Sequence, residues 1–333
     1  MKWALIGAST IASQHMIDAI RAQDGNEVVS VLSSNAARGE AYAAEHGIPT
    51  ATTDLDALLA EPGLDAVYIS TTNEKHHPQA MAAIAAGKHV LCEKPLAMSV
   101  SDAREMVDAA ASAGLVFGTN HHLRNAGSHL KIRELIADGR IGTVQAVRVA
   151  HAVYLPEHLQ GWRINDASAG GGVIPDIVVH DADTVRFHLG EDPVDVTAIE
   201  RVDSLGQGVE DSVMSVWRMP SGALVQTHEG FTIRHAGTSF EVHGTEGSIV
   251  ARDVMTQMPV GSITLKTADG SEDVPFSDHL LYVRAVGLFV DAMRGVGAPS
   301  ATGIDGVKSL AVAEAVKRAA TTGARVAVDY GGL

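Results

Sequence analysis

The sequence predicts an α/β protein with two sheets of different kinds. Up to about residue 120, short strands alternate with helical segments, and nearly every strand is a continuous apolar run, as buried parallel strands are. Beyond that point the strands alternate apolar and polar residues, which is typical of antiparallel strands with one covered face. We therefore expect a doubly wound parallel sheet of the Rossmann type at 1–122 and an α+β domain with a mainly antiparallel, open sheet at 123–333.

The N-terminal segments follow one another in a regular strand–helix order. The apolar run at 2–9 leads into a turn of small residues, and apolar residues then recur at helical spacing over 11–22. Gly47 and Gly87 stand where glycine usually ends a helix. The expected strands are 2–9, 26–34, 64–71, 88–95 and 115–120, and the expected helices are 11–22, 36–47, 54–63, 76–87 and 99–114.

The C-terminal segments show a different pattern, with long alternating strands and fewer helices. A glycine-rich loop separates the first long strand from the helix at 177–190. No repeat or low-complexity linker divides the chain, so we expect two directly joined domains with a cleft between them. The expected strands are 143–154, 194–202, 211–219, 222–231, 238–252, 261–268 and 324–330, and the expected helices are 128–139, 177–190, 278–294 and 304–322.

Composition excludes several classes of function. The net charge of −15 argues against nucleic-acid partners and against anionic membranes, because the field of the protein repels phosphate. The single cysteine, Cys92, allows no internal disulfide and no multi-cysteine zinc site. With no apolar run of about 18 residues and no signal-like start, we expect a cytoplasmic protein without a membrane partner. The oligomeric state is left open.

A variant of the dinucleotide fingerprint lies between the first strand and the first helix. In GASTIA (7–12), Gly7 and Ala12 match the first and third positions of G-x-G-x-x-G/A. Ser9 replaces the middle glycine, which normally lets the pyrophosphate approach the backbone; a serine is small, and its hydroxyl can donate to phosphate. The alternative is an ordinary tight strand-to-helix turn. The position of the motif, between a strand and a helix, favours dinucleotide binding, with the helix N-terminus supplying amide donors.

The end of the second strand indicates which dinucleotide is bound. NAD sites usually carry an acidic residue here to bind the ribose hydroxyls, whereas this chain has Ser33 and Ser34, with Arg38 four residues later. A carboxylate would repel the 2′-phosphate of NADP, while two hydroxyls and a guanidinium would bind it. A polar loop with an exposed helix arginine is the simpler alternative. The missing acid and the added base together favour NADP (NADPH) over NAD.

Two further motifs carry chemistry. In HVLCEKPLAM (89–98), an apolar strand is followed by Glu93 and Lys94, and the next residue is a proline, which restricts the backbone. This segment is either a solvent-exposed turn or a turn that holds Lys94 rigidly at a cofactor site. Downstream, Asp176 and His180 are spaced i, i+4 near the start of a helix. A carboxylate there favours a protonated histidine, so the pair can deliver a proton. Helix capping by Asp176 and core packing by His180 are the alternative.

These motifs together resemble the glucose–fructose oxidoreductase, inositol dehydrogenase and rhizopine catabolism (Gfo/Idh/MocA) family. The collinear motifs are GASTIA at 7–12, STTNEKHHPQA at 70–80, EKPLA at 93–97 and GGGVIPDIVVHDAD at 170–183. The resemblance implies a two-domain NAD(P)-dependent oxidoreductase of sugars or cyclitols, with Lys94, Asp176 and His180 as catalytic residues. It places cofactor contacts at Gly7, Ser9, Thr10, Ile11, Ala12, Ser33, Ser34, Arg38, Thr71, Thr72, Asn73, His76, Glu93, Lys94, Asn120, Trp162 and Arg163.

The resemblance and the NADP reading predict reduction of a neutral, unphosphorylated keto-sugar. In this hypothesis Lys94 stabilises the developing alkoxide, His180 donates the proton and Asp176 orients it. Either Lys94 or His180 could be the donor. Alternatives are an NAD-linked sugar or cyclitol dehydrogenase, a non-catalytic NADP sensor, and a metal-dependent hydrolase suggested by 16 histidines. No H-E-x-x-H spacing supports the last, so we expect no metal.

Overall fold

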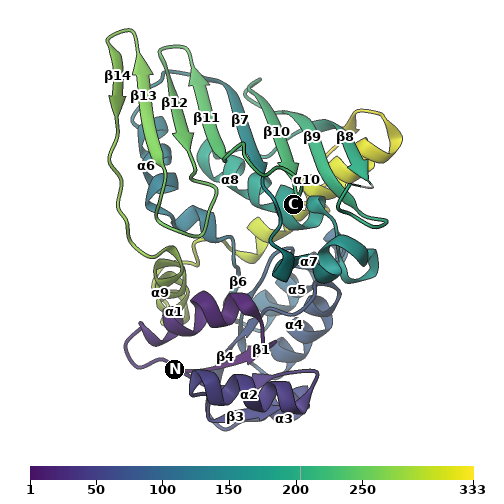
Figure 1. The fold of residues 1–333 in the computed structure, drawn as a ribbon. Coiled ribbons are helices and arrows are strands. Elements are labelled where there is room, and N and C mark those ends of the chain that lie inside the picture. Colours follow the sequence, from purple (N-terminus) through teal and green to yellow (C-terminus); the bar gives the residue numbers. More distant parts are fainter. Residues whose placement is uncertain (203) are drawn as a thin grey trace. The chain divides into compact units, whose positions relative to one another are not determined.

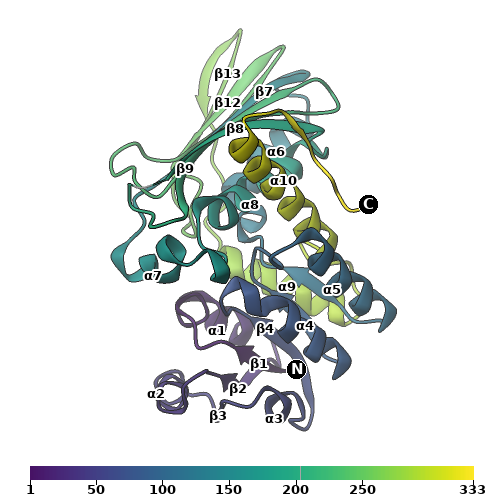
Figure 2. The same cartoon turned by 90° about the vertical axis from the view of Figure 1, so that its right-hand side faces the viewer.

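The computed structural model describes residues 1–202 and 204–333, which separate into two compact units (Figures 1 and 2). The first unit consists of 1–121 and 282–307, and the second of 122–281 and 308–333. The sequence predicted domains at 1–122 and 123–333, whereas the structure groups 282–307 with the first unit. Among helices in the described part of the chain, none is both long and apolar enough to cross a membrane.

The first unit contains a parallel six-stranded sheet in the order β3-β2-β1-β4-β5-β6. This is the strand order of a dinucleotide-binding Rossmann fold and confirms the predicted fold class. The order reverses at β1, so the carboxyl ends of β1 and β4 flank the switch point where such sheets bind ligands. The strands are β1 (Lys2–Ile6), β2 (Glu27–Leu32), β3 (Thr50–Thr52), β4 (Leu64–Ile69), β5 (His89–Cys92) and β6 (Phe117–Thr119).

Helices of the first unit begin and end at residues that the sequence marks. The Asn35 side chain accepts from the backbone N–H of Arg38 and caps α2, which ends at the left-handed Gly47. Ser99 caps α5 in the same way. The elements are η1 (Ala12–Met16, a π-helix), α1 (Ile17–Arg21), α2 (Ala36–His46), α3 (Leu55–Leu59), η2 (Asn73–Lys75), α4 (His76–Ala85) and α5 (Val100–Ser112).

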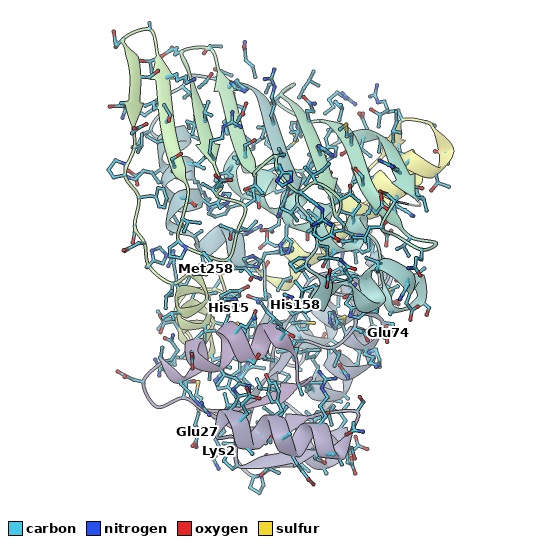
Figure 3. All side chains as sticks on the ribbon, viewed as in Figure 1. Lys2, His15, Glu27, Glu74, His158 and Met258 are labelled. Carbon is cyan, nitrogen blue, oxygen red and sulfur yellow. The ribbon has the colours of Figure 1, made fainter. Side chains whose placement is uncertain are left out.

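Helix α9 (Leu281–Met293) explains why a late segment belongs to the N-terminal unit. Phe289 on this helix lies 5.5 Å from Trp3 of β1 between ring centroids, and both side chains are fully buried. The Tyr282 ring stacks on His15, which Figure 3 labels, with centroids 4.7 Å apart. Helix α9 therefore supplies part of the apolar cover of the parallel sheet.

The second unit contains a nine-stranded sheet in the order β14-β13-β12-β11-β7-β10-β9-β8-β15. All pairings are antiparallel except that of β7 with β10, which is parallel. The mainly antiparallel sheet is thus confirmed. Its strands are β7 (Val144–Ala152), β8 (Asp195–Val202), β9 (Glu210–Arg218), β10 (Leu224–Gly230), β11 (Ser239–Gly244), β12 (Gly247–Arg252), β13 (Ser262–Thr267), β14 (Gly270–Asp273) and β15 (Val326–Ala327).

Helices cover one face of this sheet, and the core lies between them (Figure 2). Trp217, Phe231 and Phe240 are among its largest fully buried side chains. Alternation along β9 leaves Met214 and Val216 exposed on the opposite face, as expected for a sheet with one covered face. The helices are η3 (His122–Asn125), α6 (Gly127–Ala137), α7 (Glu157–Asn165), η4 (Ala167–Ala169), η5 (Ile174–Val178, a π-helix), α8 (Val179–Leu189) and α10 (Gly303–Thr322).

Several local features differ from the sequence prediction, among them the unpredicted strands β3 and β14. The segment 238–252 forms the hairpin of β11 and β12 rather than one strand, with the turn at Thr245 and Glu246. Helix α7 lies in the segment we read as a glycine-rich loop, with Gly161 in a non-helical conformation. The helix predicted from 177 is preceded by the π turn η5, which includes Asp176. Short or irregular elements carry too little periodicity to be recognised.

Candidate active site

Gly7 is required by the backbone of the turn after β1. Its φ is +117°, and a Cβ added there would lie 3.0 Å from the carbonyl oxygen of Ser70. The Gly7 N–H donates to the carbonyl of Leu32 at 3.1 Å, which ties the turn to β2. The turn therefore runs close to the ends of two neighbouring strands, and only glycine has the space and the conformational freedom to do so.

Ser9, which replaces the middle glycine of the fingerprint, holds this turn together. Its Oγ lies 2.7 Å from the Oγ of Ser70 and accepts from the backbone N–H of Ala12 at 3.2 Å. Thr10 and Ile11 complete the turn, and the π-helix η1 begins at Ala12. The serine thus caps the first helical turn.

The predicted 2′-phosphate residues gather at the end of β2. Ser33 is buried, and its Oγ accepts from the Asn35 N–H at 3.3 Å, whereas Ser34 and Arg38 are exposed. Arg38 lies in the first turn of α2 and donates from Nη2 to the Ala8 carbonyl at 2.6 Å. The guanidinium is therefore held beside the glycine turn.

The segment after β4 is organised around a buried histidine. His76 is 1% exposed; its Nδ1 lies 2.8 Å from the Pro95 carbonyl oxygen and its Nε2 3.2 Å from that of Thr71. Burial lowers the pKa of His76, and a neutral imidazole can donate to only one of these carbonyls at a time. The ring thus links the turn after β4 to the turn after β5. Thr72 and Asn73 lie in the same segment, where Asn73 is buried.

Glu93 forms the centre of a polar cluster next to Lys94. Its carboxylate accepts from the Tyr68 hydroxyl and, at 2.5 Å, from Asn120 Nδ2. Burial raises the pKa of Glu93, while the two hydrogen bonds oppose that rise. The Lys94–Pro95 peptide bond is cis. Lys94 therefore follows a carboxylate that is fixed on both sides, at the carboxyl end of β5.

In the second unit, three predicted site residues lie together around the start of the π turn. Arg163 Nε is 3.6 Å from Asp176 Oδ2, and the Arg163 guanidinium lies 4.7 Å from the centre of the Trp162 ring. Gly171 and Gly172 bring their loop against α7, since Gly172 N–H donates to the Arg163 carbonyl at 2.8 Å. The sequence associated Trp162 and Arg163 with the cofactor; here Arg163 pairs with a predicted catalytic carboxylate.

His180 is 7% exposed and lies among other histidines. Its ring centroid is 4.8 Å from that of His122, in an edge-to-face arrangement, and 6.3 Å from that of His151. Neither neighbour stands out in the sequence. His122 is one of the 16 histidines that suggested a metal, and His151 occupies one position in an alternating strand. Tyr68, the partner of Glu93, was missed for the same reason: an isolated strand residue carries no local signal.

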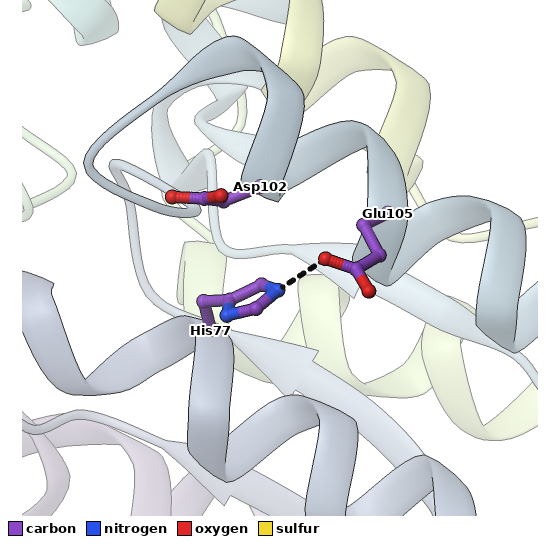
Figure 4. Close-up of side chains that lie close together, drawn as sticks. All are labelled: His77, Asp102 and Glu105. Carbon is purple, nitrogen blue, oxygen red and sulfur yellow. Dashed lines mark hydrogen bonds and ion pairs between the residues drawn. The ribbon is translucent and has the colours of Figure 1, made fainter.

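One group of side chains in residues 1–202 and 204–333 has the spacing of metal ligands (Figure 4). His77 on α4 faces Asp102 and Glu105 on α5, and their potential ligand atoms lie within 4.8 Å of one another. His77 Nε2 is 2.9 Å from Glu105 Oε2, and the Glu105 side chain is exposed. The arrangement is explained as a hydrogen-bonded pair that joins two neighbouring helices.

Family comparisons match both parts of the chain. Residues 1–121 match the Gfo/Idh/MocA model described as "Oxidoreductase family, NAD-binding Rossmann fold", and residues 129–250 match the "GFO/IDH/MocA C-terminal domain". The fold and its dinucleotide turn are thus those of an NAD(P)-binding oxidoreductase. The chain belongs to the Gfo/Idh/MocA oxidoreductase family, as its motifs indicated.

Individual relatives extend over nearly the whole chain. A 1,5-anhydro-D-fructose reductase from Ensifer adhaerens is 56% identical over 331 residues, covering 99% of both chains. An inositol 2-dehydrogenase from Rhizobium meliloti (strain 1021) is 30% identical, covering 96% of both. Among solved structures, the aldose-aldose oxidoreductase from Caulobacter crescentus, complexed with glycerol, has a TM-score of 0.90 at 26% identity, covering 98% of this chain and 99% of the other.

Proposed function

We propose that this enzyme reduces 1,5-anhydro-D-fructose to 1,5-anhydro-D-mannitol with NADPH. The observation that carries the proposal is the 56% identity to a 1,5-anhydro-D-fructose reductase over 99% of both chains. The motifs GASTIA, SSNAAR and GWRIND agree with the same assignment. Because NADPH pools are generally kept reduced, we infer that reduction is the physiological direction. We also propose that the enzyme works in the cytoplasm.

The residues of the first unit fit a phosphorylated dinucleotide. Gly7 has no side chain, and a Cβ added there would lie 3.0 Å from the Ser70 carbonyl oxygen, so the backbone is open at this point. The glycine turn comes just before the start of η1. Ser33 puts no carboxylate at the end of β2, and Arg38 is exposed beside the Ala8 carbonyl. We infer that Arg38 and Ser34 hold the 2′-phosphate, while the amides of the glycine turn hold the pyrophosphate.

Reduction of the ketone adds a hydride to the carbonyl carbon and a proton to its oxygen. The bound nicotinamide would supply the hydride. We propose that the Lys94 ammonium donates a hydrogen bond to the carbonyl oxygen and stabilises its negative charge as it develops. His180 then gives the proton, because the ordinary pKa of histidine lies near neutral pH and its deprotonated form is stable there.

Asp176 and Trp162 would bind the sugar. A carboxylate paired with Arg163 at 3.6 Å stays an acceptor for substrate hydroxyls, and the partly exposed Trp162 ring offers a flat apolar surface to a pyranose. Ketones without hydroxyls beside the carbonyl would leave these polar groups unpaired and should be poor substrates.

The proposal is tested by comparing NADPH-dependent kcat/KM for 1,5-anhydro-D-fructose, free hexoses, hexose phosphates and a plain cyclic ketone. We expect 1,5-anhydro-D-fructose to be preferred by at least about a hundredfold over the plain ketone, as loss of buried hydrogen-bonding partners predicts. A preference for a sugar phosphate would contradict the proposed substrate.

A further inference from the structure

Two fully buried carboxylates face each other behind the first turn of α8. Asp181 directly follows His180, Glu229 lies on β10, and both side chains are 0% exposed. The two carboxyl groups are close enough for the charge of Asp181 to act on Glu229. Asp181 Oδ2 and Glu229 Oε1 are buried oxygens that no donor reaches in the part of the chain described. Two neighbouring buried carboxyl groups cannot both ionise at low cost, and a single proton placed between them would give both oxygens a hydrogen-bond partner.

The other oxygens of the pair indicate where the proton resides. Asp181 Oδ1 lies 2.8 Å from His151 Nδ1, an arrangement in which an ionised carboxylate accepts from the ring N–H. Glu229 Oε2 accepts from the neutral Thr227 hydroxyl at 3.1 Å. Burial and the neighbouring Asp181 charge raise the pKa of Glu229 well above its ordinary value. The proton therefore belongs to Glu229.

We propose that Asp181 and Glu229 share one proton, held by Glu229, and that this pair positions His151 and His180 at the active site. Glu229 and His151 are register partners on the parallel strands β10 and β7. Asp181 ties the first turn of α8 to β7 through His151, at the residue next to His180. The His151 ring lies 6.3 Å from the His180 ring, so its tautomer and orientation are set beside the proposed proton donor.

This inference rests on the proposed function in one respect, the role of His180 as proton donor. A carboxylate close to an imidazole ring in general favours the protonated form of that ring. The elements packed around the pair contribute these further charged or titratable side chains: His122 and Arg124 on η3, His129 on α6, His151 on β7, Asp176 on η5, His180 and Asp183 on α8, and Glu210 and Asp211 on β9.

The first test needs no enzymatic activity. Glu229→Gln replaces the protonated carboxyl by an amide that can donate to Asp181 and accept from Thr227. In the native wild type Glu229 keeps its proton, whereas in the unfolded chain it loses that proton above about pH 4.3. The stability of the wild type therefore falls as pH rises towards the raised pKa of Glu229. The variant has no such proton and should not show this fall. Glu246→Gln, at an exposed glutamate, controls for the loss of a carboxylate.

We expect urea unfolding from pH 5 to pH 8 to show the wild type losing stability relative to Glu229→Gln. The ratio of the wild-type unfolding equilibrium constant to that of the variant should rise about tenfold per pH unit. A gap between the two proteins that does not change with pH would mean that Glu229 is ionised in the native state, and would overturn the shared proton. This arm stands whether or not the substrate assignment is correct.

The second test follows the pH profile of kcat. Glu229→Leu removes the donor to Asp181 and should lower kcat by about tenfold, and Glu229→Gln should restore most of it, since a neutral donor is returned. Asp181→Asn removes the negative charge, so the loss of activity at high pH should begin at lower pH, with the KM for NADPH unchanged. If the glutamine variant fails to rescue, or the profile of Asp181→Asn coincides with that of the wild type, the pair has no positioning role. If Asp181→Asn does not fold, His151→Gln replaces it: this variant keeps the Asp181 charge but removes the ring beside His180, so kcat should fall with the pH profile unchanged, and an unchanged kcat would overturn the positioning role.

Discussion

The guanidinium of Arg38 donates a hydrogen bond to the carbonyl oxygen of Ala8 at 2.6 Å. Arg38 lies in the first turn of α2 and Ala8 in the glycine turn after β1, so this bond connects the two segments that a dinucleotide phosphate would touch. The Tyr42 hydroxyl donates to the Ser9 carbonyl at 3.0 Å and adds a second link from the same helix. Cofactor selectivity should therefore depend on a preformed surface.

Replacing Arg38 by alanine should selectively raise the KM for NADPH. Loss of a charge-assisted contact costs about 1.5–3 kcal/mol, which corresponds to roughly a ten- to hundredfold loss in the NADPH/NADH ratio of kcat/KM. Ser33→Asp should shift the ratio in the same direction by repelling the 2′-phosphate. Arg21→Ala serves as the control for loss of an arginine. Arg21 is exposed and donates to the His46 carbonyl at 2.7 Å. Unchanged ratios in both variants would show that the phosphate pocket lies elsewhere.

Lys94→Ala and His180→Ala should each lower kcat by ~10²-fold or more, because each removes a group that we propose acts on the reacting oxygen. NADPH affinity, measured by fluorescence titration, should change much less for His180→Ala, since the expected dinucleotide contacts lie mainly in the first unit. Lys75→Ala, at a lysine paired with Glu74 at 3.7 Å, is a control for loss of positive charge in the same unit. Full activity in either active-site variant would exclude the proposed roles.

Gly172→Ala should be far more damaging than Gly190→Ala, although both glycines have positive φ. At Gly172, φ is +116° and an added Cβ would lie 2.4 Å from Glu210 Oε1; at Gly190, φ is +68° and no atom lies within 4 Å. We expect a loss of about 1 kcal/mol for Gly190→Ala and at least about 2 kcal/mol for Gly172→Ala. Equal unfolding midpoints in urea would disprove the close approach of this loop to Glu210.

Acid should destabilise the second unit through His129. Its Nδ1 lies 3.0 Å from His188 Nε2, and burial lowers the pKa of His129 to about 4. The unfolded chain binds a proton below about pH 6.5 that the native state excludes, so stability is complete above that pH and falls as pH drops to about 4, by on the order of 3 kcal/mol. Urea unfolding at several pH values should show a smaller fall for His129→Gln and an unchanged fall for the exposed His235→Gln.

Much of the fold follows from the periodicity of apolar residues. Continuous apolar strands predict the parallel sheet, and alternating strands predict the antiparallel one. The partner of a helix is harder to derive: the apolar face of α9 indicates burial, but only the structure shows that Phe289 packs on Trp3, 286 positions earlier in the chain. Short elements such as β3 and η5 are decided by tertiary packing rather than by local sequence.

Some residues of the candidate site can be predicted from local sequence, and others cannot. Gly7, Lys94 and His180 lie in motifs with fixed spacing, so they can be proposed from sequence. His151 and Glu229 come together through strand register, and Asp181 reaches them across the helix–sheet interface. Such contacts join residues distant in the chain and leave no local pattern. A buried acid on a central strand, as in THEG at 227–230, is the one signal that could have pointed to Glu229.

The most direct test of the account is a paired measurement of the two directions with the wild-type enzyme. The absorbance of reduced nicotinamide is followed with 1,5-anhydro-D-fructose and either NADPH or NADH, and in parallel with a cyclitol and either NAD or NADP. We predict efficient oxidation of NADPH with 1,5-anhydro-D-fructose, at a kcat/KM at least about tenfold above that with NADH. Efficient NAD-linked oxidation of the cyclitol, without NADPH-dependent reduction of 1,5-anhydro-D-fructose, would contradict the account.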